Sequence, residues 1–168
     1  MRSRLACLAL LALVALVAYT GSVLATPQSG FTPAQQWKGV FEEIDVKSND
    51  FHPHQVKIKT KEVSDVYVTR NTIAPRTATS PGGQSGWHTH PGPSLIIVTV
   101  GQIAAYEGDD PTCTPKVYKA GDGFVDPGGG HAHLLRNETT DPAETVAVQI
   151  LPKGADRRID ILPAPVNC

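Results

Sequence analysis

The chain has 168 residues, of which 40% are hydrophobic and 18% are charged, and its formal net charge is −1 at pH 7. This length suits one domain with a core of its own. The 15 basic and 16 acidic residues form no basic patch and no basic amphipathic helix. This composition argues against a nucleic-acid partner and, for the mature chain, against a membrane partner.

The first 25 residues have the pattern of a secretory signal peptide that is cleaved after Ala25. Arg2 and Arg4 form a short basic start, and residues 5–17 are almost wholly Leu, Ala and Val. A small-residue cleavage sequence then ends at Ala25. The pattern predicts a secreted, extracellular protein. The weaker alternatives are an uncleaved membrane anchor, for which the apolar run is short, and a lipoprotein modified at Cys7, which precedes most of that run.

Residues 26–55 form an N-terminal extension in this interpretation. Within it, residues 31–37 favour a short helix, with Thr32 as the N-cap and Pro33 at the first helical position. From Val56 onward apolar and polar residues alternate, which predicts strands at residues 56–60 and 66–69. Residues 74–86 are rich in Pro, Gly and Ser and are expected to form a loop.

Short β-type segments separated by Gly, Pro and Asp turns follow to residue 151. Residues 95–100 are apolar on both faces, which predicts a strand buried on both sides. No stretch after residue 50 supports a long amphipathic helix, and many short strands indicate an all-β sandwich or barrel over residues 56–151. The expected strands are 87–90, 95–100, 102–106, 116–119, 123–125, 132–137 and 144–151.

Cys113 and Cys168 are the two cysteines left after signal cleavage. Two cysteines in an exported chain are expected to pair, which would tie the C-terminal tail, residues 152–168, to the loop at residues 109–115. Two free or intermolecular thiols are the alternative. Neither cysteine has the surroundings of a catalytic nucleophile.

The six histidines of the chain all lie in His-x-His pairs, at His52/His54, His88/His90 and His131/His133. Residues i and i+2 of a strand point to the same face, so each such pair can direct two imidazoles at one point. First-row transition metals are bound in this way. The first pair precedes the clear strands and is expected in a surface loop, rather than in a second metal site.

The residues around the second and third pairs resemble the cupin superfamily. Gly82-x5-His88-x-His90-x3-Ser94-x6-Gly101 matches the first cupin motif, G-x5-H-x-H-x3,4-E-x6-G, at every fixed position but one. Gly121-x5-Pro127-x-Gly129-x3-His133-x3-Asn137 matches the second motif with one extra residue before the histidine. The chain looks like a small secreted bacterial single-domain cupin of the type-2 conserved-barrel kind. The resemblance implies a double-stranded β-helix, the cupin jelly-roll barrel, at residues 56–151.

The resemblance also implies a metal site formed by His88, His90 and His133. The metal would be a divalent transition metal, Fe, Mn, Zn, Ni or Cu, whose identity the motifs leave open. The family's fourth ligand, a Glu, falls on Ser94, so that the site would be a neutral three-His site. Ser94 could then hold a metal-bound water from the second shell.

Three further residues are candidates for the pocket. The extra residue in the second motif lets either His131 or His133 occupy the ligand position, and His133 keeps the spacing to Asn137. His131 could face inward, as a fourth ligand or an acid/base group, or it could stay at the surface. Asn137 and Tyr106 are expected as polar groups of the pocket or second shell.

Two functions are consistent with this pattern. One is a metal-dependent enzyme with dioxygenase-like or hydrolytic activity on a small molecule, for which the sequence identifies no catalytic residue beyond His131. The other is a non-catalytic barrel that binds a small ligand, a sugar or a metal. A homodimer formed through sheet edges is a further expectation. The barrel itself does not choose among them, because function depends on the site.

Overall fold

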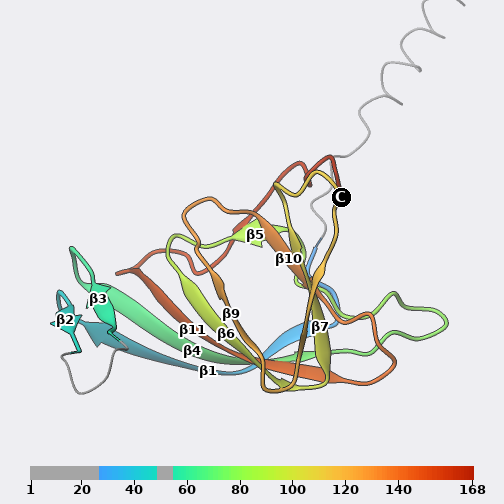
Figure 1. Cartoon of the computed structure of the whole chain (residues 1–168), viewed down its shortest axis with the longest axis horizontal. Coiled ribbons are helices and arrows are strands. Elements are labelled where there is room, and N and C mark those ends of the chain that lie inside the picture. Colours follow the sequence, from blue (N-terminus) through green and yellow to red (C-terminus); the bar gives the residue numbers. More distant parts are fainter. Residues whose placement is uncertain (1–26, 49–54) are drawn as a thin grey trace, which may run out of the picture.

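The computed structural model describes residues 27–48 and 55–168, which form two five-stranded antiparallel sheets and one two-stranded sheet (Figure 1). The first sheet has the order β1 (Phe31–Phe41), β4 (Ser64–Ile73), β11 (Ala143–Pro152), β6 (Ser94–Val100) and β9 (Gly123–Asp126). The second has the order β12 (Ile159–Asp160), β5 (His88–Thr89), β10 (His133–Arg136), β7 (Gln102–Glu107) and β8 (Lys116–Lys119). The small sheet pairs β2 (Asp45–Lys47) with β3 (Lys57–Lys59).

The chain passes repeatedly between the two large sheets. After β4 in the first sheet it enters the second at β5, returns at β6, crosses again to β7 and β8, and continues in this manner through β9, β10 and β11. This winding is that of a double-stranded β-helix, and it confirms the predicted all-β jelly roll. The described residues contain no helix that is long and apolar enough to cross a membrane.

The helix predicted at residues 31–37 is wrong, because these residues belong to β1. This strand pairs with β4 along its length, with a register shift between Pro33 and Gln35. Pro33 is tolerated because β1 is the edge strand of its sheet, where a missing N–H costs little. The sheet pairing outweighs the local helix signal, and residues 31–41 of the expected N-terminal extension lie in the first sheet.

The prediction that residues 95–100 are buried on both faces is also wrong. Ile96 and Val98 of β6 face inward and are 5% and 0% exposed, whereas Leu95 and Ile97 are 49% and 51% exposed. The sheet is antiparallel and one of its faces is open to solvent, so only alternate residues are covered. An apolar run therefore does not by itself establish burial on both sides.

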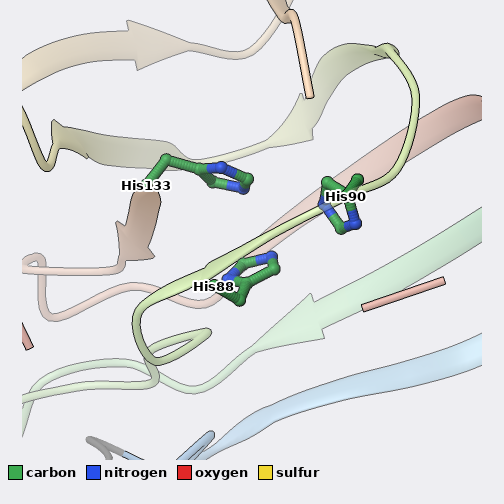
Figure 2. Close-up of side chains that lie close together, drawn as sticks. All are labelled: His88, His90 and His133. Carbon is green, nitrogen blue, oxygen red and sulfur yellow. The ribbon is translucent and has the colours of Figure 1, made fainter. Parts of the chain in front are cut away.

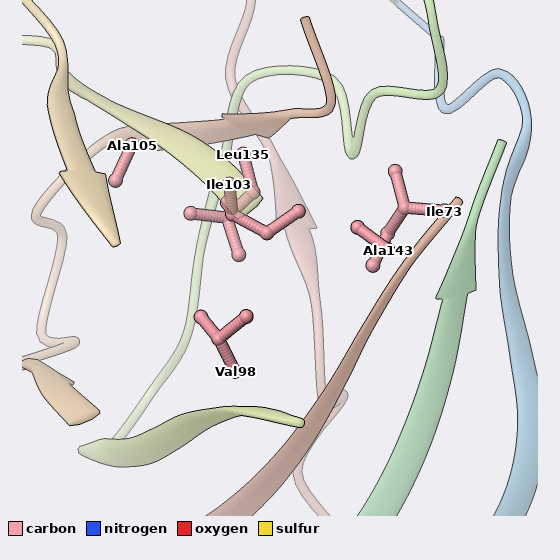
Figure 3. Packing of buried hydrophobic residues seen from close by; sticks show 6 residues of the cluster. All are labelled: Ile73, Val98, Ile103, Ala105, Leu135 and Ala143. Atoms are coloured by element: carbon pink, nitrogen blue, oxygen red, sulfur yellow. The ribbon is translucent and has the colours of Figure 1, made fainter. Parts of the chain in front are cut away.

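The apolar core lies between the two sheets. Val98 of the first sheet and Leu135 of the second belong to one cluster of buried side chains (Figure 3). Ser94 lies two inner positions before Val98 on β6, and His133 lies one inner position before Leu135 on β10; both are also buried. The inner face thus changes from apolar to polar along each strand. The polar part holds the candidate site. The full cluster is Ile73, Val98, Ile103, Ala105, Leu135 and Ala143.

A disulfide between Cys113 and Cys168 confirms the expected pairing, with a Cα–Cα distance of 5.3 Å. The two residues are 55 positions apart, and closing a loop of this length stabilises the fold by about 4 kcal/mol in the chain-entropy model. The bridge fastens the end of the chain beside the loop that joins β7 to β8. The predicted signal peptide and the His52/His54 pair lie outside the described residues.

Candidate metal centre

Three of the predicted histidines converge inside the barrel (Figure 2). His88 lies on β5 and His90 directly follows this strand, while His133 begins β10. His133 stands directly opposite His88 in the antiparallel pair of β10 and β5. One ring nitrogen of each residue lies within 4.8 Å of the others, and all three side chains are buried. The two-residue periodicity and the strand register together produce this convergence.

Backbone carbonyl groups orient two of the imidazoles. His88 Nδ1 lies 2.8 Å from the carbonyl oxygen of Gly86, and His90 Nδ1 contacts that of Arg157. A carbonyl oxygen only accepts hydrogen bonds, so each Nδ1 carries the proton and donates it. The Nε2 atom of each ring then carries the lone pair, and that of His90 also lies 3.4 Å from Gln149 Nε2. Metal-binding histidines are commonly held in this way.

Burial keeps the histidines of this cluster neutral. Burial, together with electrostatic repulsion from the neighbouring His133 and Arg158, lowers the pKa of His88 to about 2. Burial also lowers the pKa of His133 to about 4, although Asp126 opposes the shift. The pKa of His90 is lowered mainly by burial. Neutral imidazoles keep the lone pair that a metal ion needs.

A carboxylate that the sequence interpretation did not select also reaches this cluster. Asp126 ends β9, and its side chain is only 3% exposed. Its Oδ1 lies 3.5 Å from His133 Nδ1, and its Oδ2 lies 3.7 Å from His90 Nε2. The sequence Asp-Pro-Gly at this point is typical of a turn. The aspartate was therefore predicted to lie in a turn, and its inward-facing position at the end of a strand was missed. The signal that could have revealed it is the alternation of Phe124 and Asp126.

Ser94 lines the cavity and takes part in a chain of hydrogen bonds. Gln149 of β11 donates from Nε2 to Ser94 Oγ at 3.2 Å. Gln149 Oε1 in turn accepts a hydrogen bond from Arg157 Nε at 2.9 Å. The carbonyl group of Arg157 contacts His90, so the chain links the serine position to the orientation of one imidazole. Gln149 and Arg157 lie in no motif, and the sequence interpretation missed both.

Tyr106 and Asn137 were predicted to be polar groups of the pocket or second shell, and neither is among the residues that line the cavity. Tyr106 donates a hydrogen bond to Glu138, and the guanidinium of Arg136 lies 5.4 Å from its ring centre. Asn137 is fully buried and donates from Nδ2 to the carbonyl oxygen of Asp141 at 2.7 Å. The Asn137 side chain thus stabilises the loop that connects β10 to β11.

His131 lies beside the three-His cluster rather than in it. Its Nδ1 is 3.5 Å from Asp126 Oδ1, and its Nε2 is 3.2 Å from Glu107 Oε2. The side chain is one quarter exposed. His131, Asp126 and His133 form a second group of ligand atoms within 4.8 Å of one another. His133 is therefore common to both groups.

The cluster opens into a small cavity of about 80 Å³. The three histidines and Ser94 line its inner part, and Phe31, Arg157 and Arg158 are among its other lining residues. A cavity of this size admits a ligand of only a few non-hydrogen atoms, since pockets for drug-sized ligands are roughly 300–1,000 Å³.

The donor atoms suit a divalent transition metal. Three neutral imidazole groups converge, and they are ligands that zinc, iron, nickel and copper all accept. Asp126 Oδ2 is buried and has no hydrogen-bond partner among the described residues. A buried carboxylate oxygen without a donor is costly unless a cation is near it. The described residues of this cluster could thus hold a metal ion.

Comparison with known proteins gives a family and several similar folds. Residues 76–149 match the family model described as Cupin domain. A Cupin 2 conserved barrel domain protein from Salinispora arenicola is 21% identical, with a TM-score of 0.40, over 50% of this chain and 61% of that chain. The match thus spans less than two thirds of the Salinispora protein.

Two further solved structures are matched over a larger share of both chains, at somewhat lower identity. An uncharacterized protein with a double-stranded beta-helix domain from Klebsiella pneumoniae is 19% identical over 79% of this chain and 83% of that chain, with a TM-score of 0.46. The polyketide cyclase RemF from Streptomyces resistomycificus is 16% identical over 60% of this chain and 64% of that chain, with a TM-score of 0.45. No curated protein matches the chain.

Proposed function

Because the chain belongs to the cupin superfamily through its Cupin domain at residues 76–149, we propose that it is a metal-dependent enzyme acting on a small molecule. The observation that carries the proposal is the convergence of three buried, neutral imidazoles on one point inside the barrel. Such an arrangement costs desolvation energy and contributes little to packing. A bound cation offsets this cost.

The residues of the site have separate tasks in this proposal. His88, His90 and His133 hold the ion, which when bound supplies Lewis-acid or oxygen chemistry according to its identity. The carbonyl groups of Gly86 and Arg157 fix the rings of His88 and His90. The cavity excludes bulk water and limits the ligand to a small molecule.

Arg157 and Arg158 favour an anionic ligand for this cavity. Both residues line it. The Nε atoms of the two guanidinium groups are engaged, by Gln149 and Asp160 respectively. Arg158 forms an ion pair with Asp160 at 2.6 Å, whereas Arg157 Nε is bonded to the neutral Gln149. The positive charge of Arg157 therefore lies close to the metal ligands, where partial burial strengthens its attraction for an anion. We therefore propose a small anionic molecule as the substrate class.

Removal of the histidines tests the metal site. We expect the parent protein, purified without chelator or His-tag, to hold about one equivalent of a first-row metal in elemental analysis. The variant His88→Ala/His133→Ala should lose it. The matched control is His52→Ala/His54→Ala, which removes the other His-x-His sequence and should keep the metal. No metal in the parent, and none taken up on titration, would contradict the proposal.

We also propose that the protein is exported. The support is the signal-like pattern of residues 1–25 together with the Cys113–Cys168 disulfide, which is compatible with an oxidising compartment. Intact-mass measurement of the protein from the culture medium should give a chain that begins at Thr26 and gains two hydrogens on reduction. A chain found only inside the cell, with residues 1–25 retained, would count against export.

A further inference from the structure

The first cupin motif has a glutamate at the position that Ser94 occupies in this chain. Ser94 faces the inside of the barrel, is 1% exposed, and accepts a hydrogen bond from Gln149. A serine hydroxyl is a poor ligand for a divalent ion, and it brings no negative charge. The three histidines alone would leave the charge of the ion unbalanced in a buried site.

The neighbouring strand places a carboxylate directly across from this serine. In the antiparallel pair of β6 and β9, Ser94 stands opposite Asp126. Side chains at directly opposed positions share one face, and their Cβ atoms lie about 4.5–5.5 Å apart. Both side chains are buried. The carboxylate absent from β6 is therefore present on β9, one strand away and on the same inner face.

Asp126 has no lysine or arginine partner within the described part of the chain. Its Oδ1 accepts a hydrogen bond from the backbone N–H of Gly128 at 3.0 Å, and its Oδ2 has no hydrogen-bond partner within the described part of the chain. Among the described residues, the charged or chargeable side chains near the Asp126 carboxylate are His90, His131 and His133, at 3.5 to 3.7 Å. A carboxylate that is 3% exposed needs a cation or several donors to offset its desolvation.

The orientation of His90 indicates where that cation lies. Its Nδ1 donates to the carbonyl oxygen of Arg157, so its Nε2 carries a lone pair. This Nε2 lies 3.7 Å from Asp126 Oδ2 and 3.4 Å from Gln149 Nε2, which also donates to Ser94. Two lone-pair atoms that face each other in a buried site repel unless a positive ion lies between them. Ligands around a tetrahedral ion with bonds of about 2.1 Å are about 3.4 Å apart, close to this separation.

We propose that Asp126 is a metal ligand, and that it supplies from β9 the carboxylate that Ser94 does not supply from β6. The inference rests on the proposed metal site. A carboxylate would lower the net charge of the loaded site from +2 to +1 and add a hard oxygen donor to the imidazoles, as in sites with histidine and carboxylate ligands.

The test compares metal affinity and the spectrum of the bound ion. Zn²⁺ affinity is measured by competition with a chromophoric chelator, and the visible absorption of bound Co²⁺ reports the ligand set. Asp126→Asn keeps an oxygen that can accept from Gly128 but removes the charge. We expect its Zn²⁺ affinity to fall more than about 100-fold, beyond the 10–100-fold typical for loss of an outer-shell partner, and the Co²⁺ spectrum to change.

A transfer variant sharpens the test. Ser94→Glu/Asp126→Asn returns a carboxylate to the motif position and should recover at least about 10-fold in Zn²⁺ affinity over Asp126→Asn alone. The matched control is Asp109→Asn, an exposed aspartate 4.0 Å from His131, which should bind like the parent. If Asp126→Asn alone does not fold, Asp126→Ser takes its place in both variants.

The outcomes separate this inference from the proposed function. If the parent binds Zn²⁺ and Asp126→Asn binds it equally well, or more weakly but with an unchanged Co²⁺ spectrum, then Asp126 is not a ligand while the three-His site stands. If the parent binds neither ion, the proposed metal site itself fails. Loss of affinity with a changed spectrum, followed by recovery in the transfer variant, supports Asp126 as a ligand.

Discussion

The metal-free protein is expected to lose about 5 kcal/mol of unfolding free energy between pH 7 and pH 4.5 through two histidines alone. Burial lowers the pKa of His88 to about 2 and that of His133 to about 4. In the unfolded chain both groups return to their ordinary pKa of 6.5. Below pH 6.5 the two histidines are therefore protonated in the unfolded state but remain neutral in the native state.

The sign follows from this difference in bound protons. The stabilisation is fully present above pH 6.5 and falls by about 1.4 kcal/mol per pH unit for each group as the pH decreases. The loss ends near pH 4 for His133 and near pH 2 for His88, where the native state also becomes protonated. Single domains have about 5–15 kcal/mol of stability in total, so the effect reaches the scale of the whole fold.

Urea unfolding of chelator-treated protein at several pH values measures this dependence. The variant His88→Gln/His133→Gln removes both titrating groups and should reduce the slope between pH 6.5 and pH 5, where most carboxylates stay ionised. If the metal-free parent keeps a constant unfolding free energy over that interval, the histidines are not buried in neutral form, and the geometry described for the cluster is wrong.

The histidine pairs were predictable because their placement depends on local rules. His88 and His90 lie two residues apart on a strand and share a face by geometry alone. The family motif then identified His133 as their partner, and the strand register places it opposite His88. The disulfide was predictable from the small number of cysteines. These features need only spacing, periodicity and composition.

Other features depend on contacts between distant parts of the chain. Asp126 reaches the cluster only because β9 pairs with β6 in one register, and a shift of one residue would turn it outward. Residues 31–41 form a strand because β4 offers a partner. Tyr106 faces away from the cavity because its neighbours Ile103 and Ala105 take the inner positions of β7. Sequence periodicity does not fix such choices.

The turn after β9 gives the second large effect, and here two adjacent glycines form a matched pair. Gly128 and Gly129 both have a φ of +65°, in the left-handed region. A Cβ atom on Gly128 would lie 2.2 Å from the carbonyl oxygen of Gly92, whereas a Cβ atom on Gly129 would meet nothing within 4 Å. The positive φ therefore disfavours an alanine at both positions to a similar degree. Only Gly128 adds a collision with the backbone.

We expect Gly129→Ala to cost about 1–2 kcal/mol through backbone strain and Gly128→Ala to cost about 1–3 kcal/mol more through the collision. Urea unfolding of the two variants at neutral pH measures the difference. Gly128→Ala should also weaken metal binding, because the N–H of Gly128 holds Asp126 Oδ1. Equal losses in the two variants would show that the turn shifts to relieve the contact.

The comparison also bears on the extra residue in the second motif. The motif's fixed glycine falls on Gly129, yet the structure makes Gly128 the position that tolerates no side chain. Three successive glycines, Gly128 to Gly130, adopt positive φ values, so the turn can absorb the extra residue before His133 enters β10. A larger loss of stability in Gly128→Ala than in Gly129→Ala would mean that the position requiring glycine has moved one residue toward Asp126. This shift would let His133 keep its place opposite His88 despite the extra residue.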